Sequence, residues 1–291
     1  MKLVNTDWHM HSAYSCDEAC MTYEDLVASA NEAGLVEFGV TDHLHNQTHY
    51  SDIERSRKAY DQTLEKHPEL KGRFHFGVEA SVMSQWEIEK VSRGELAGIT
   101  KHGFRMVGPA FDQPVILADS EFKERFGVEY VVTGVHWSLY APFTPEDTIR
   151  DFFRLWKFAA AWPQTDILAH FGWWFPVQAI ENPDMEFTLE NPFTQFSKAF
   201  SPSMLDEMKA ILLEHNTALE LNACAMLMSR QYPETFKDEY LGWFGDLQRA
   251  GVTLSWGSDC HDARLIPQFY DFTDTLAHYG IDPEKFFRIN R

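Results

Sequence analysis

The sequence predicts an α/β barrel built from seven strand–helix units. Seven short apolar runs rich in β-branched residues recur along the 291 residues, and longer stretches of helical periodicity separate them. Strands that alternate with helices pair in parallel through right-handed crossovers. Side chains able to bind metals stand where the runs end, and parallel barrels build their active sites at that end of the strands. An open doubly wound sheet is the alternative architecture.

Each element follows from a local pattern. The seven predicted strands span residues 2–9, 36–43, 74–81, 128–137, 166–171, 217–223 and 252–259. The first predicted helix opens with Thr22 and Asp25 in the spacing of a capping box and closes with Gly34. A second amphipathic stretch, residues 203–216, precedes the sixth strand. Its apolar face consists of Met204, Leu205, Met208, Ile211 and Leu212.

Two stretches interrupt the alternation of strands and helices. Residues 84–127 form a long excursion after the third strand and include an irregular segment with glycine and proline. Residues 172–200 combine aromatic residues, prolines and turn residues. Long loops of this kind often bind ligands or cover sites. No low-complexity tract or Ser/Gly-rich linker divides the chain, so we expect one barrel domain over residues 1–291.

Charge and composition narrow the classes of function. The chain carries 25 Lys and Arg against 44 Asp and Glu, a formal net charge of −19. Because nucleic-acid binding needs clustered cations, we predict no nucleic-acid partner. The sequence has no apolar run of transmembrane length and its first residues lack the pattern of a signal peptide, so we expect a cytoplasmic protein without a membrane partner. The four cysteines do not form a disulfide framework.

Polar side chains with metal-binding potential follow every predicted strand. In chain order they are His9, His11, Asp42, His43, Glu79, His136, His170, Glu220, Asn222, Asp259 and His261. Alternation places His9 and His11 on the same side of the first strand. In a parallel barrel all of these strand ends converge on one rim. Imidazole and carboxylate together suit Zn, Mn or Fe, so the sequence predicts a metal site at this rim.

Six motifs resemble those of the PHP (polymerase and histidinol phosphatase) superfamily in order and rough spacing. They read "HMHSAYSCD", "TDH", "GVE", "GVHW", "AHFG" and "GSDCH". Residues 11–43 are similar to the histidinol-phosphatase-like branch along their whole length, and the resemblance extends from residue 7 to about residue 264. It implies a distorted (β/α)7 TIM-like barrel that holds two or three divalent metal ions at the C-terminal ends of its strands.

The resemblance also implies a ligand set for each ion. The first ion would be held by His9, His11, Glu79 and Asp259. Glu79 would bridge to a second ion, bound also by His136 and His170, and the third would be held by Asp17, His43 and His261. Many members of the branch have a histidine where this chain has Asp17. A harder oxygen ligand there would either weaken the third site or shift its preference towards Mn or Fe.

The implied chemistry is hydrolysis of a small phosphomonoester by a metal-activated hydroxide, with histidinol phosphate as one candidate substrate. Candidate catalytic carboxylates are Asp259, Glu79 and Asp42, and Asp42 is expected to orient a ligating histidine. A metal-dependent hydrolase of another bond, and a metal-binding regulatory module without turnover, are the alternatives. The partner would be a small phosphorylated metabolite, and the sequence leaves the oligomeric state open.

For other residues near the predicted rim, the sequence is less specific about their role. Arg230 and Arg264 follow the last two strands and either bind the phosphate group or are solvated surface residues. His45 and His49, just beyond the second strand, either reach the substrate or are exposed loop histidines, and exposure is the expectation. Four aromatic residues follow ligand positions and either wall a pocket or pack in the core. They are Trp137, Trp173, Trp174 and Phe175.

Overall fold

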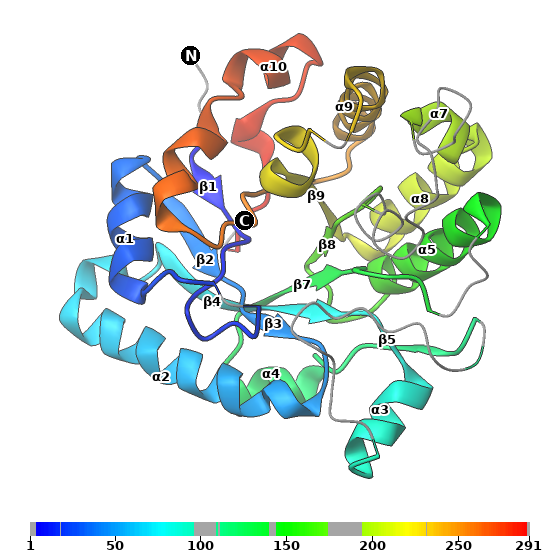
Figure 1. Ribbon diagram of the computed structural model, residues 1–291. Coiled ribbons are helices and arrows are strands. Elements are labelled where there is room, and N and C mark those ends of the chain that lie inside the picture. Colours follow the sequence, from blue (N-terminus) through cyan, green and yellow to red (C-terminus); the bar gives the residue numbers. More distant parts are fainter. Residues whose placement is uncertain are drawn as a thin grey trace.

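Parallel strands form a nearly closed barrel, and helices surround it (Figure 1). This computed structural model describes residues 4–17, 19–95, 109, 111–139, 144–173, 194–230 and 232–289. The strands follow one another around the barrel as β1 (Thr6–Asp7), β2 (Glu37–Val40), β4 (Phe74–Ser81), β7 (Tyr130–Gly134), β8 (Ile167–Ala169), β9 (Ala218–Asn222) and β10 (Leu254–Gly257). Each lies within a predicted run, and the predicted barrel is confirmed.

Backbone hydrogen bonds near the first and last strands close the ring. The amide of Trp8 donates to the carbonyl of Trp256 (3.0 Å), and the amide of Asp259 donates to the carbonyl of His9 (2.7 Å). Met10 and Cys260 form an isolated parallel bridge further along. Because β1 and β10 meet in this way, the C-terminal ends of the first and last strands lie together at one rim.

The second predicted strand is interrupted. It ends as β2 at Val40, and a short strand β3 (His43–Leu44) then pairs in parallel with β4, with His43 opposite Glu79. Between them, the carbonyl of Asp42 accepts a hydrogen bond from the amide of Glu79 (3.2 Å). The break therefore brings His43 beside the carboxylate end of β4.

Helices occupy the connections between strands. They are α1 (Tyr23–Glu32), α2 (Tyr50–Lys66), α3 (Gln85–Ser92), α4 (Ser120–Phe126), α5 (Pro145–Ala160), α7 (Phe196–Ala199), α8 (Pro202–His215), α9 (Glu234–Arg249) and α10 (Thr273–His278). Short 3-10 helices span Gln47–His49, Pro68–Leu70, Ala263–Tyr270 and Pro283–Lys285, and a π-helical turn spans Ala223–Leu227. Within the described residues, no helix is both long and apolar enough to cross a bilayer.

Capping and amphipathic patterns account for the two helices predicted in detail. Thr22 and Asp25 form the expected reciprocal capping box at the start of α1. In α8, Met208 and Leu212 are buried. The other three predicted apolar residues of α8 pack partly buried against the core.

The excursion at residues 84–127 is more regular than expected in its described part. It begins with α3 and ends with α4, and β5 (Met83–Ser84) pairs antiparallel with β6 (Pro114–Val115). In the excursion at residues 172–200, only residues 172–173 and 194–200 belong to the described part, and they include α7.

Large aromatic side chains fill the N-terminal half of the barrel. Tyr130, the first residue of β7, lies against Gly39 and Gly77, and a Cβ at either glycine would collide with its ring. The Tyr130 hydroxyl donates to the carbonyl of Trp8 (3.0 Å).

A buried carboxyl group also lies within the barrel wall. Asp7 is fully buried and accepts hydrogen bonds from the Tyr270 hydroxyl (2.6 Å) and the Ser258 amide (3.0 Å). Burial raises the pKa of Asp7 to about 6, because desolvation outweighs these hydrogen bonds.

Candidate metal centre

The structure brings all nine predicted metal-binding side chains together at the C-terminal rim. They come from the ends of β1, β4, β7, β8 and β10, from β3, and from the segment after His11. The set is His9, His11, Asp17, His43, Glu79, His136, His170, Asp259 and His261. Contacts of less than 4 Å between nitrogen and oxygen atoms link each of them to another member.

Glu79 lies at the centre of this cluster, fully buried at the end of β4. Its Oε1 lies 3.0 Å from His136 Nε2 and 2.9 Å from His170 Nε2. Its Oε2 lies 2.7 Å from His43 Nδ1 and 3.2 Å from His9 Nε2. Each oxygen thus faces a different pair of imidazoles, which is the arrangement that a carboxylate bridging two ions needs.

A second carboxylate, Asp259, faces the first strand. Its Oδ1 lies 3.2 Å from His11 Nε2 and 3.6 Å from His9 Nε2. His11 Nε2 also lies 3.5 Å from Glu79 Oε2. The four residues expected to share the first ion are therefore neighbours in the structure.

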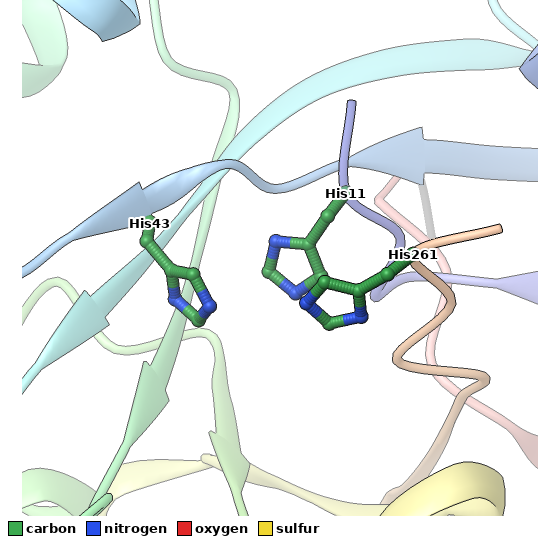
Figure 2. A group of neighbouring side chains, drawn as sticks. All are labelled: His11, His43 and His261. Carbon is green, nitrogen blue, oxygen red and sulfur yellow. The ribbon is translucent and has the colours of Figure 1, made fainter. Parts of the chain in front are cut away.

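The third predicted ligand set lies at the outer side of the cluster. Asp17 Oδ2 lies 3.2 Å from His43 Nε2 and contacts His261 Nε2. The His11 ring stacks on the rings of both histidines, with centroid distances of 4.4 Å to His43 and 4.3 Å to His261. Figure 2 shows these three rings gathered from separate segments of the chain. His11 thereby connects the first and third predicted sets.

Unsatisfied buried atoms test whether these residues fit metal ions. The ring nitrogens His9 Nε2, His11 Nε2, His43 Nδ1 and His136 Nε2, together with Glu79 Oε2, are buried without a hydrogen-bond partner. Each of these nitrogens lies within 4 Å of a carboxylate oxygen of Glu79, but not in hydrogen-bond geometry. An unsatisfied buried polar atom costs about 1–3 kcal/mol. Their convergence, with ligand atoms in groups of three within 4.8 Å of one another, fits a mixed nitrogen and oxygen donor set for Zn, Mn or Fe.

The electrostatics favour the metal-binding protonation state for Glu79 and His11. Burial opposes ionisation of Glu79, but the imidazoles of His43 and His9 outweigh it and hold the pKa of Glu79 well below its usual range. Burial, reinforced by His261 and His43, lowers the pKa of His11 to about 3. An ionised carboxylate and a neutral imidazole with a free lone pair are the forms that bind metal. For His9 and His43 the Glu79 carboxylate outweighs burial and raises the pKa well above its ordinary value, so a bound metal would displace a proton from each ring.

The backbone around the cluster is shaped by close approach and by left-handed residues. Gly134, at the end of β7, has no side chain, and a Cβ there would lie 2.6 Å from Glu79 Oε1 and 2.7 Å from His136 Cε1. His170 and Asp259 have φ angles of 59° and 55°. Non-glycine residues in this region cost of order 1–3 kcal/mol and cluster at functional sites.

Several residues outside the three predicted ligand sets contact the candidate ligands. Glu220 Oε1 lies 2.6 Å from His9 Nδ1. Ser81 Oγ lies 2.9 Å from His136 Nδ1 and 2.7 Å from His45 Nδ1. The sequence places Glu220 at a strand end, and alternation from Glu79 would have placed Ser81 on the same side of β4. Residue type alone does not identify Ser81 as a partner of histidine.

The expectation that His45 and His49 are exposed is wrong. Their exposed fractions are 5% and 7%, respectively. His45 stacks on His43 with a ring-centroid distance of 4.7 Å. Its amide donates to His49 Nδ1 (3.2 Å). His45 directly follows β3, which pairs with β4, and its ring also packs against those of His136 and Trp137, each at 5.5 Å.

Asp42 has different partners from those expected. Its carboxylate accepts hydrogen bonds from the Ser12 amide (2.6 Å), the Ser12 hydroxyl (2.7 Å) and the Ser56 hydroxyl. Among the described residues, none of the hydrogen bonds found for this carboxylate involves a histidine. Asp42 therefore fixes the chain that follows His11 instead of orienting an imidazole.

The two candidate phosphate-binding arginines differ in their surroundings. Arg264 is 85% exposed in its side chain and pairs with Asp262, which its Nε contacts at 2.9 Å and 3.0 Å. Arg230 is exposed. A phosphate group would have to compete with Asp262 for Arg264, so Arg230 is the better candidate of the two.

The aromatic residues near the rim divide between core and wall. Trp137 is buried, with 2% of its surface exposed. Trp173 is half-buried, and its ring lies 5.0 Å from that of His170. Trp174 and Phe175 lie outside the described residues. Trp173 therefore covers one side of a predicted ligand, and Trp137 packs in the core.

Residues 7–224 match the PHP domain family, and because this match spans more than half of the chain, the protein belongs to that family. No curated protein sequence matches the chain.

Comparison with solved structures found similar chains at low sequence identity. A candidate histidinol phosphatase from Listeria monocytogenes has a TM-score of 0.58 and 13% identity, with 89% of this chain and 96% of that chain covered. An ochratoxinase from A. niger has a TM-score of 0.42 and 10% identity, with 97% of this chain and 67% of that chain covered. The Listeria protein supports the barrel fold.

Proposed function

We propose that this protein is a metal-dependent phosphoesterase that hydrolyses a small phosphomonoester. The observation that carries the proposal is the Glu79-centred cluster of buried, unsatisfied nitrogen and oxygen atoms in a PHP-family barrel. When bound, divalent ions would supply Lewis acidity that activates water and neutralises charge on phosphoryl oxygens. We assign the nine clustered residues to holding two or three ions of Zn, Mn or Fe.

The finer assignments extend the same proposal. Glu79 and Asp259 act by holding and orienting the ions, and their position in the cluster supports this role. Arg230 would contact the phosphate group as it enters. Histidinol phosphate is one candidate substrate, because a structurally similar protein from Listeria monocytogenes is described as a candidate histidinol phosphatase. We also propose that the chain is a single barrel domain that acts on a small metabolite.

Phosphate release by the purified protein tests this function. The protein is stripped with a chelator and then loaded separately with Mn, Zn or Fe. The panel contains histidinol phosphate, sugar phosphates, nucleoside monophosphates and an aryl phosphate. We expect release only with metal, and loss of release in Glu79→Gln. Release from other esters but not histidinol phosphate would keep the chemistry and reject that substrate.

Absence of release from every ester, with metal verified in the protein, would overturn the phosphoesterase proposal. Metal binding without any turnover would favour a regulatory module. Turnover of a carboxylic ester or an amide by the loaded protein, with Glu79→Gln inactive, would favour a hydrolase of another bond. Glu79 separates these outcomes because its loss should remove metal and turnover together only if the protein is a catalyst.

A further inference from the structure

One buried carboxylate at the rim has both of its oxygen atoms occupied by protein groups. Glu220, in β9, has an exposed fraction of 1%. Its Oε1 lies 2.6 Å from His9 Nδ1. Its Oε2 accepts hydrogen bonds from the backbone amide of His170 (3.3 Å) and from Asn222 Nδ2 (3.1 Å). With both oxygens engaged in this way, Glu220 is a support for neighbouring groups and not a metal ligand.

Asn222 extends the contacts of Glu220 to a second carboxylate. Its Nδ2 also donates to Asp259 Oδ2 (3.2 Å), and its Oδ1 accepts a hydrogen bond from the amide of Ala225 (2.7 Å). The amide of Asn222 therefore has a fixed orientation, with its nitrogen between the carboxylates of Glu220 and Asp259. Glu220 and Asn222 together form what we call the β9 brace.

The β9 brace reaches three residues that form one candidate metal group. His9, His170 and Asp259 have ligand atoms within 4.8 Å of one another. His170 and Asp259 are also the two members of the cluster with left-handed backbone conformations. A residue in that region persists only when its surroundings hold it there. The brace bonds directly to the backbone of His170 and, through Asn222, to the side chain of Asp259.

The neighbouring strand leaves room for this arrangement. A Cβ at Gly257 in β10 would collide with Glu220 Oε1 and would lie 2.8 Å from His9 Cβ. Glycine at this position thus keeps the Glu220 carboxylate and the His9 ring in contact. An ionised carboxylate can only accept a hydrogen bond here, so in a neutral His9 ring the proton lies on Nδ1 and the lone pair of Nε2 is directed into the cluster.

We infer that the β9 brace positions the first predicted ion through two of its ligands, His9 and Asp259, and that it also fixes the backbone of His170 beside them. Glu220 and Asn222 are positioning residues that act through those ligands. The inference rests on the metal centre of the proposed function. It goes beyond that function because it states that Glu220 and Asn222, which do not contact the ion, determine how tightly that ion binds.

The test compares two carboxylates that make similar contacts at different places. Glu129 lies 2.8 Å from His75 Nδ1 and accepts hydrogen bonds from the Phe76 amide (3.0 Å) and the Tyr60 hydroxyl (3.0 Å). It lies at the N-terminal end of β7, away from the cluster. Glu129→Gln therefore disturbs a comparable histidine–carboxylate pair without disturbing the β9 brace.

Metal affinity is measured by competition with a chromophoric chelator, using Zn or Mn and the full chain of the wild type, Glu220→Gln and Glu129→Gln. Loss of a partner that orients a ligand typically weakens metal binding 10- to 100-fold. We expect Glu220→Gln to bind one ion 10- to 100-fold more weakly and to bind the remaining ions with wild-type affinity. Glu129→Gln should bind every ion with wild-type affinity.

Histidine 15N NMR gives a readout that a merely structural role would not change. In the metal-free wild type at a pH where the His9 ring is neutral, His9 should carry its proton on Nδ1, and in Glu220→Gln this tautomer should no longer be fixed. If Glu220→Gln does not fold, Asn222→Ser replaces it, because that change releases Asp259 and leaves the His9–Glu220 pair intact. We expect Asn222→Ser to weaken binding of the same ion, but by less than Glu220→Gln does.

The outcomes separate this inference from the proposed function. Wild-type affinity in a folded Glu220→Gln variant would overturn the inference and leave the metal centre standing. Equal losses in Glu220→Gln and Glu129→Gln would also overturn it, because the effect would then be general. Failure of the wild type to bind any divalent ion would overturn the proposed function and the inference together.

Discussion

Replacing Gly134 by alanine tests whether the clustered side chains bind metal in the arrangement seen here. The three atoms nearest to the added Cβ belong to three predicted ligands: Glu79 Oε1 at 2.6 Å, His136 Cε1 at 2.7 Å and His170 Cδ2 at 3.0 Å. The φ angle of Gly134 does not require glycine, so the added methyl group acts by steric contact alone. The perturbation is therefore confined to the ligands on β4, β7 and β8.

The required displacement can be estimated from these distances. Ordinary contact for a Cβ begins at 3.4 Å, so the Glu79 oxygen at 2.6 Å would have to move by about 0.8 Å. Metal sites tolerate ligand distances within roughly 0.2 Å of their usual values. We expect Gly134→Ala to weaken binding of the ion near Glu79, His136 and His170 by at least 10- to 100-fold, the range seen for disturbed ligand support. Overpacking of this kind also costs about 1–3 kcal/mol of stability.

Gly77→Ala is the matched control for this prediction. Its Cβ would lie 2.5 Å from Cζ and 2.6 Å from Cε1 of Tyr130, in the opposite half of the barrel. Both variants should lose stability in urea unfolding of the metal-free protein, but only Gly134→Ala should lose metal in equilibrium dialysis. Wild-type metal affinity in folded Gly134→Ala would refute the assignment of these three residues to one ion.

Three further predictions address the buried acid, the outer ligand support and the arginines. The pKa of Asp7 is raised to about 6, above its unfolded value near 3.9, so the stability it contributes is full below pH 4 and is lost as the pH rises through 6. In urea unfolding of the metal-free protein, the free energy of unfolding of the wild type should therefore fall by about 1.4 kcal/mol more than that of Asp7→Asn between pH 5 and pH 8. An equal fall in both proteins would contradict the raised pKa of Asp7. Ser81→Ala should weaken binding of the ion near His136 about tenfold in equilibrium dialysis, because the Ser81 hydroxyl orients the His136 ring. Arg230→Ala should raise the KM for a phosphomonoester several-fold with metal content unchanged, and Arg264→Ala should change it less than about twofold in the same assay, because its ion pair already occupies the guanidinium.

The strands and the clustering of the candidate ligands were predictable from the sequence for a common physical reason. Parallel strands of a barrel end at one rim, so a polar residue at each end is placed near the others without any knowledge of loop structure. Glu79, His136 and His170 illustrate this, because they end three neighbouring strands and meet within about 3 Å in the structure. The periodicity of the runs alone was enough to bring these groups together.

The supporting contacts were not predictable because alternation gives the side of a strand and not the partner of an atom. Glu79 and Glu220 both stand near the end of a predicted strand, yet one lies among the ligands and the other behind them. The difference depends on strand register and on the space left by Gly257. Neither can be read from a strand considered by itself.

The break in the second strand explains the errors near His43. A continuous strand through residue 43 would lead into a surface loop, which is why His45 was expected to be exposed. The chain instead leaves the barrel order after Val40 and pairs again at His43 through β3. Asp42 lies in the break and bonds to Ser12, so its carboxylate stabilises the irregular path of the chain.

In both halves of the barrel interior, glycine residues make room for a neighbouring side chain. In the N-terminal half, Gly39 and Gly77 make room for the Tyr130 ring. In the C-terminal half, Gly134 and Gly257 make room for the carboxylates of Glu79 and Glu220. Glu79 and Glu220 are buried, and the low dielectric of a buried site strengthens every interaction of their carboxylates. Glycine positions in four strands thus determine where the barrel is apolar and where it can hold charge.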